Sequence, residues 1–309
     1  MSTRQEVCGG FIVCTDASSI VISHPAGRWS VLSSSEGGYS ETPDQLTLTN
    51  ETPQIGKFTI KTSPDVKTAS LVSKSHRMTS VSALVIADPN PSVNGDKAGG
   101  HRISVVLMVD ADLPTGTMAR AAITSTEAVT CAFQQLMIGR SDRKEISSGS
   151  DSICISVLSN IGCGRRLYGA GKHSKLGELI GNTVIEATIS SMGKNGVTQD
   201  SQADVFKRLE RFGVTKRSCR EYLTTVGLVP GDGFDAALDA ISGDRIMLSY
   251  VSAVLQIADE ISWKLIPKAE GYKIGRKIIC AAISEDASKS NDLVADIVSA
   301  IAMRALGDI

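Results

Sequence analysis

The sequence lacks a large net charge and long apolar runs, and each absence excludes a class of protein. Its 309 residues carry 32 Lys and Arg against 33 Asp and Glu, a formal net charge of -1. Because balanced charge creates no strong field, neither nucleic acid nor a membrane surface is an expected partner, and a small ligand fits better. No run of eighteen apolar residues occurs, so no transmembrane helix is predicted.

Paired cysteine motifs are also missing. The seven cysteines are odd in number and contain no CxxC pair, which argues against a disulfide framework and against a structural zinc site. The first residues lack the basic-then-apolar order of a signal peptide. We therefore expect a reduced, cytoplasmic protein without a bound metal or cofactor, and leave open whether its reaction requires a metal.

Three common catalytic motifs are absent as well. There is no GxSxG elbow, and none of the four histidines belongs to an HExxH pair. Residues 168–175 resemble a phosphate-binding loop at a helix start, but Arg166 replaces the first glycine of a P-loop and His173 follows Lys172 where Ser or Thr is required. A nucleotide-binding enzyme using residues 169–175 is therefore only a minor alternative.

The first two thirds of the chain combine strand and helix patterns. Short β-branched segments predict a meander of strands, and near-continuous apolar runs at 81–87 and 103–110 predict strands buried on both faces. Helical spacing predicts a helix at 117–137, and a strand at 153–158 precedes a glycine-rich loop and a second helix ending near residue 192. The meander segments are 10–14, 19–23, 29–33 and 57–61.

From residue 199 onward, strand patterns give way to helical ones. Helices are predicted at 203–212, 216–226, 234–241, 246–265, 273–283 and 292–306. We expect an α+β fold, with a mixed β-sheet and packed helices at 1–198, followed by an all-helical C-terminal domain or appendage at 199–309.

One helix carries a polar stripe that is a candidate for chemistry. Within 117–137, Arg120, Thr124, Glu127 and Cys131 fall at i, i+4, i+7 and i+11 and are expected to share one face. Charges on a helix usually form a solvated face, but Thr124 and Cys131 are less typical of such a face. Ligand contact is therefore the other interpretation.

Three further positions adjoin the predicted strands and helices. Asp110 and Asp112 come just past a buried strand, where ligand-facing carboxylates collect, although cap and turn roles fit equally well. His173 stands at a helix start and can serve as an acid, base or hydrogen-bond donor near pH 7. Gly177 permits close approach by a neighbouring element, which we favour, or by a ligand.

Residues 119–128 and 170–181 form two longer segments, and residues 31–39 form a shorter one before them. The two longer segments resemble the central motifs of the adenosylcobinamide amidohydrolase family, and residues 31–39 are similar to an earlier element of that family. The resemblance covers roughly residues 5–212. Two loops depart from the family pattern, because Asn94-Gly-Asp96 and Ser148-Gly-Ser150-Asp151 look like contracted versions of longer family loops.

The resemblance implies hydrolysis of the aminopropanol amide of adenosylcobinamide, which yields adenosylcobyric acid for coenzyme B12 salvage. His173 or Glu127 would then act as acid or base, while Lys172, Asn94 and helix-start amides would donate hydrogen bonds. The contracted loops leave a non-catalytic corrinoid-binding protein as the main alternative. The corrinoid would be the small-molecule partner, and a homo-oligomer remains open.

The expected site combines these residues. We expect the loop at 94–101, the strand end at 110–112, the segment 148–151 and the helix start at 171–173 to converge on one cavity. The residues expected to bind the substrate are Asn94, Asp96, Asp110, Asp112, Arg120, Thr124, Ser150, Asp151, Gly171, Lys172 and Gly177.

Overall fold

The computed structural model describes residues 3–34, 38–51, 58–88, 102–138, 153–283 and 292–307. These residues form two compact units, and the chain passes from the first to the second between Thr198 and Gln199. The first unit contains the strands and two long helices, and the second contains helices. The expected α+β class is confirmed.

The first unit is built on a mixed six-stranded sheet. Its two central neighbours, β10 and β11, run parallel, and the other neighbouring strands pair antiparallel. The strand order is β5 (Tyr39–Glu41), β4 (Trp29–Ser33), β11 (Ile153–Asn160), β10 (Ile103–Val109), β9 (Thr79–Ala87) and β8 (Ser70–His76).

A second sheet of five strands packs against one face of the first. Only its β6–β7 pair is parallel. The strand order is β1 (Thr3–Glu6), β2 (Ile12–Thr15), β3 (Ser19–Ser23), β6 (Leu46–Thr49) and β7 (Phe58–Lys61).

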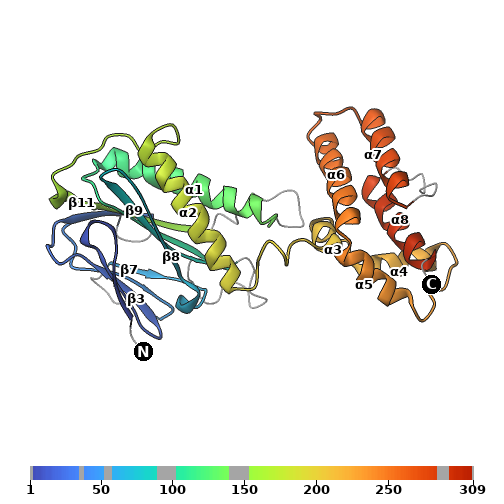
Figure 1. The fold of residues 1–309 in the computed structure, drawn as a ribbon, viewed down its shortest axis with the longest axis horizontal. Helices are drawn as coiled ribbons and strands as arrows, with labels where there is room; N and C mark the ends of the chain where they lie inside the picture. The colour runs from blue at the N-terminus through green and yellow to red at the C-terminus, as the bar shows by residue number, and fades with distance from the viewer. Residues whose placement is uncertain are drawn as a thin grey trace. The chain divides into compact units, whose positions relative to one another are not determined.

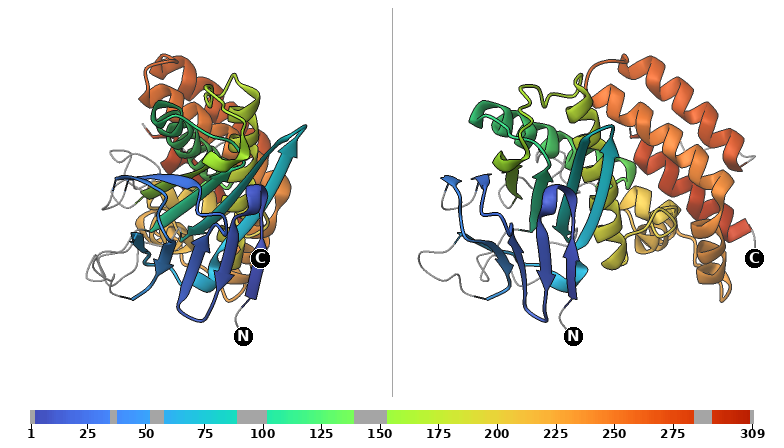
Figure 2. Two further views of the ribbon diagram at one scale, coloured as in Figure 1. Left: turned by 90° about the vertical axis from the view of Figure 1, so that its left-hand side faces the viewer. Right: turned by 60° about the vertical axis from the view of Figure 1, so that its left-hand side comes forward.

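Two helices cover the opposite face of the six-stranded sheet. These are α1 (Thr115–Gln135) and α2 (Lys175–Lys194), which lie side by side over the sheet in Figure 1. The five-stranded sheet lies on the other side of the central strands (Figure 2). The central sheet is thus the middle layer of three.

Alternate side chains of β10 belong to two different apolar clusters, one on each face of the central sheet. Val105 and Leu107 pack toward the helices, whereas Val106 and Met108 pack toward the five-stranded sheet. Successive side chains of a strand point to opposite faces, so an apolar residue at nearly every position suits a strand covered on both sides. The prediction that 81–87 and 103–110 are buried on both faces is confirmed.

The second unit has an apolar core of its own. Phe234, Leu238, Val254 and Ile301 are among its fully or nearly fully buried side chains. Its helices are α3 (Val205–Leu209), α4 (Lys216–Thr225), α5 (Phe234–Gly243), α6 (Arg245–Ser262), α7 (Lys268–Ile283) and α8 (Leu293–Gly307). Each overlaps a helix predicted from the sequence.

Some strands were not predicted. The strands β1, β5, β6 and β8 have no counterpart among the expected segments. The edge strand β8 explains one omission, because five of its seven residues are Ser, Lys or His and several of its side chains are exposed. No helix in the described part of the chain is long and apolar enough to cross a membrane.

Candidate active site

Two connections lie side by side at the carboxyl edge of β10 and β11. Because these strands are parallel neighbours, the turn that leads from β10 to α1 and the longer loop at 161–174 that leads from β11 to α2 leave the same edge. The Ser159 hydroxyl donates to the carbonyl of Ala111 at 2.9 Å and accepts from the amide of Leu113 at 2.7 Å. The end of β11 therefore fixes the turn after β10.

The two predicted carboxylates both contact arginines of the 161–174 loop. Asp112 forms a parallel bridge with this loop, since its amide donates to Arg165 and its carbonyl accepts from Leu167. Its carboxylate lies 3.5 Å from Nε of Arg166. Asp110 contacts Arg165 through both its carbonyl and its carboxylate. Both carboxylates thus help to join the two connections.

The start of α2 packs closely against α1. The Thr124 hydroxyl donates to the carbonyl of Ala170 at 2.8 Å, and a Cβ added at Gly171 would lie 3.7 Å from Cδ of Arg120. A Cβ at Gly177 would lie only 2.0 Å from the carbonyl oxygen of Gly171. The structure therefore brings together four predicted substrate-binding positions, and Gly177 is explained by backbone packing, the interpretation that we favoured.

Ser174 begins α2 and orders the loop before it. Its hydroxyl accepts from the amide of Gly177 at 3.0 Å and is 2.8 Å from the carbonyl of Gly171, to which it donates. A serine at this position satisfies a helix-start amide that would otherwise have no partner within the helix. Ser174 was not among the predicted residues, although its position as helix cap was readable from the sequence.

The polar stripe expected on α1 is divided in the structure. Arg120 and Glu127 are exposed, but Thr124 is only 4% exposed because the loop before α2 covers it. The expectation that these residues share one solvent-facing or ligand-facing stripe is therefore wrong for Thr124. A threonine can look polar in a helical pattern and still be buried when a carbonyl accepts its hydroxyl proton.

Both predicted acid/base residues are accessible. Glu127 lies on α1 and His173 lies in the turn before α2, next to Lys172, and the three side chains are exposed. Within the described residues, no hydrogen bond or ion pair joins Glu127 to His173. If both take part in a reaction, each must therefore act on the substrate separately.

Four predicted residues, Asn94, Asp96, Ser150 and Asp151, lie outside the described residues. The strand register nevertheless places the neighbouring described residues. Ile103 of β10 pairs with Ala87 of β9 and with Ile153 of β11, at the amino edge of β10. Asp110 follows Ile103 by seven residues along this strand, which is about 23 Å at roughly 3.3 Å per residue. The convergence of all four predicted segments on one cavity stays a prediction.

The thiol of Cys8 also lies near Asp110 but is not activated. It donates to the carbonyl of Met108 at 3.2 Å, in the short 3₁₀ turn Cys8–Gly10. Burial raises the pKa of Cys8 to about 11, and the negative charge of Asp110 adds to this rise, while hydrogen bonds with Ser82 oppose it. A thiol with this pKa is almost wholly protonated near pH 7 and is a poor nucleophile.

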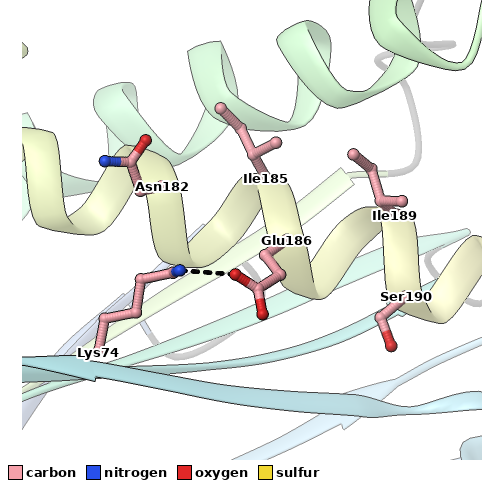
Figure 3. A pocket seen from close by; sticks show the side chains of 6 residues that line it. All are labelled: Lys74, Asn182, Ile185, Glu186, Ile189 and Ser190. Carbon is pink, nitrogen blue, oxygen red and sulfur yellow. Dashed lines mark ion pairs between the residues drawn. The ribbon is translucent and has the colours of Figure 1, made fainter.

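A groove lies elsewhere, between β8 and α2 (Figure 3). It has a volume of about 460 Å³, and Lys74 of β8 forms an ion pair with Glu186 of α2 at 2.6 Å within it. Its other lining residues are Asn182, Ile185, Ile189 and Ser190. None of the predicted site residues lines it. The described residues also contain no group of three His, Cys, Asp or Glu placed to hold a metal ion.

Comparison with known proteins gives the family. The sequence model for adenosylcobinamide amidohydrolase matches residues 33–199, a little over half of the chain, and this protein belongs to that family. The match ends where the first compact unit ends. The chain is also 37% identical over 93 residues to an uncharacterized protein, MJ1613, of Methanocaldococcus jannaschii. That similarity covers 30% of this chain and 36% of the relative.

Proposed function

We propose that this protein hydrolyses the amide that joins aminopropanol to adenosylcobinamide and so supplies adenosylcobyric acid for B12 salvage. The observation that carries the proposal is the family match at residues 33–199. Supporting it, the two motif segments of α1 and α2 contact each other through Thr124 and Ala170. The corrinoid would be a substrate, and the proposal includes no cofactor. A cytoplasmic location also belongs to the proposal and agrees with seven unpaired cysteines.

The reaction requires attack, stabilisation and proton transfer. Water adds to the amide carbonyl, the oxyanion that forms needs hydrogen-bond donors, and the departing amine takes up a proton as the C–N bond breaks. We assign His173 or Glu127 to proton transfer, because both are exposed and lie within the two family motifs. Lys172, beside His173, is the proposed donor to the oxyanion.

The direct test is product formation. Incubation with adenosylcobinamide should release aminopropanol and adenosylcobyric acid, both detected by mass spectrometry, and a parallel reaction with a chelator would reveal a metal requirement. Glu127→Gln and His173→Asn should each lower kcat by roughly 10²–10⁴-fold if the residue transfers a proton. His76→Asn and Glu186→Gln are matched controls at exposed positions outside the motifs and should retain turnover. Unchanged kcat in a folded motif variant would remove that residue from the mechanism.

The alternative is a corrinoid-binding protein without turnover, because two loops of the sequence depart from the family pattern. The motif residues Thr124 and Gly177 are occupied in packing contacts, which a binding protein would need as much as an enzyme would. Such a protein would perturb the corrin absorbance without releasing aminopropanol. A nucleotide-binding enzyme would instead be stabilised against heat by ATP or ADP, by the linkage of binding to folding.

A further inference from the structure

A polar network surrounds the carboxylate of Asp110 at the carboxyl edge of β10. The side-chain amide of Asn160, the last residue of β11, donates to Oδ1 of Asp110 at 3.1 Å, and Nη2 of Arg165 lies 3.5 Å from Oδ2. The same Arg165 nitrogen donates to the carbonyl of Asp110. Asp110 is therefore contacted by the end of the neighbouring strand and by the loop that follows it.

The network extends to the five-stranded sheet through Gly9. The carbonyl of Gly9 accepts hydrogen bonds from Asn160 at 3.1 Å and from Nε2 of His24 at 2.8 Å. The amide of Ala26 donates to Nδ1 of His24, which selects the tautomer with a proton on Nε2. Gly9 has φ of 63°, and a Cβ there would lie 2.9 Å from Oδ1 of Asp110. A glycine is needed for this close approach.

Arg165 is attached to the residues after β10 by both its backbone and its guanidinium, which distinguishes it from Arg166. Its carbonyl accepts from the amide of Asp112 at 2.8 Å, and its guanidinium contacts Asp110, so backbone and side chain both attach the loop to the β10 end. The Arg166 side chain reaches the carboxylate of Asp112 and the nearby ring of Tyr168, and it is 57% exposed against 25% for Arg165. An exposed pair of this kind restrains a loop weakly, because water screens it.

The Arg165 contact is poorly optimised for stability. The ion pair spans 3.5 Å, and the buried Nε has no partner among the described residues. Buried polar atoms without a partner are uncommon and raise the free energy of the folded state. The Arg165 contact therefore stabilises the fold little, but it determines where the loop lies. Such a contact is suited to positioning the residues of that loop.

We propose that Asp110, Asn160 and Arg165 form a positioning network that holds residues 164–174 and thereby places Lys172 and His173 for amide hydrolysis. This inference rests on the function proposed above. From Arg165 the chain runs through Ala170, held by Thr124, to the turn of Lys172 and His173. Loss of the first attachment lets the loop shift, and the turn of Lys172 and His173 shifts with it, although Thr124 still holds Ala170. Misplacement of a reacting group by about 1 Å can cost roughly 10²-fold in rate.

The test combines kinetics with hydrogen exchange in the full chain. Arg165→Gln and Asp110→Asn should each lower kcat by roughly 10- to 100-fold with KM within about twofold, since the substrate contacts remain. The double variant should be no slower than the slower single variant, because both changes remove the same attachment. Arg165→Lys should recover part of kcat, and the matched control Arg166→Gln should stay within about twofold of wild type. An additive double variant, or equal losses in Arg165→Gln and Arg166→Gln, would overturn the proposal.

Hydrogen exchange separates this inference from the proposed function. In Arg165→Gln, backbone amides at 164–174 should exchange faster than in wild type, whereas amides of α1 should not change. Wild-type protein that releases no aminopropanol would defeat the proposed function and leave this readout intact. Unchanged exchange at 164–174 in both Arg165→Gln and Asp110→Asn would show that the network does not hold the loop.

Discussion

At the residue scale, two buried serines on neighbouring strands differ in their hydrogen bonding. Ser159 of β11 is fully buried and its hydroxyl both donates, to Ala111, and accepts, from Leu113. Ser104 of β10 is also fully buried, but its hydroxyl has no partner among the described residues. A buried hydroxyl without a partner loses its hydration and gains nothing in return, which costs about 1–3 kcal/mol.

We predict that replacement of these serines by alanine has opposite effects. Ser104→Ala should raise the free energy of unfolding by about 1 kcal/mol, because it removes an unsatisfied hydroxyl. Ser159→Ala should lower it by about 1–3 kcal/mol, because the buried amide of Leu113 loses its acceptor. Urea unfolding of the two variants measures both changes. Equal destabilisation by the two substitutions would mean that the Ser104 hydroxyl is satisfied in the folded protein.

The thiols of two cysteines should have pKa values far above the usual value for cysteine. Burial raises the pKa of Cys8 to about 11 and that of Cys219 to about 12, from a free value of 9.0. Because the folded-state pKa exceeds the unfolded one, the folded state favours the protonated thiols. Their stabilisation is fully present below about pH 9 and is lost as pH rises through 11 to 12.

Alkylation checks this prediction. With iodoacetamide at pH 8, the native protein should react much more slowly at Cys8 and Cys219 than the urea-unfolded chain does, since the thiolate is the nucleophile. Peptide mass spectrometry identifies the modified positions, and the unfolded chain is the control for reagent and time. Rapid modification of Cys8 in native protein would contradict its raised pKa and its hydrogen bond to Met108.

At the element scale, the start of α2 is the most closely packed part of the candidate site. Gly171 and Gly177 bring the preceding loop against the helix, and Thr124 attaches that loop to α1. The far end of α2 is equally well determined. Gly196 has φ of 80°, and the amide of Val197 returns to the carbonyl of Met192, as in the Schellman motif.

Two glycines of α2 provide a matched comparison. Gly177→Ala should lower the free energy of unfolding by about 1–3 kcal/mol, because the new Cβ would overlap the backbone of Gly171. Gly181→Ala, where nothing lies within 4 Å of the added Cβ, should raise it by about 0.5–1 kcal/mol through helix propensity. Thermal or urea unfolding measures both. A stabilising Gly177→Ala would show that the loop moves away easily.

At the scale of the whole molecule, each compact unit has its own core. The two clusters of the first unit are drawn from residues 7–197, and the cluster of the second unit from residues 205–306. The family match ends at residue 199, near the same boundary. A unit with a closed core is expected to fold alone.

We predict that residues 1–198 fold without the helical unit. The truncated chain should unfold cooperatively on heating and show dispersed amide signals in NMR spectra, because its apolar clusters are complete. Residues 199–309, produced separately, are the complementary sample. An insoluble or non-cooperative 1–198 chain would show that the helical unit contributes to the core.

The buried strands and the helices could be predicted because their signals are local. Apolar residues at six of the seven positions of 103–109 indicate a strand covered on both faces, and regular apolar spacing indicates α1 and α2. The edge strand β8 was missed because its solvent-facing residues read as a polar loop. The strand β6 was missed although its Leu-Thr alternation is a strand pattern.

The sequence by itself determined the α+β class, the helical C-terminal region and the two motif segments that mark the family. Only the tertiary structure decided that Thr124 is buried, that Asp110 contacts Arg165, and that Ala87 and Ile153 lie at the opposite end of the central strands from Asp110. Periodicity reports which side of an element is apolar, over a few residues. Strand direction, register and loop packing depend on partners far away in the chain, such as the 55 residues that separate Asp110 from Arg165.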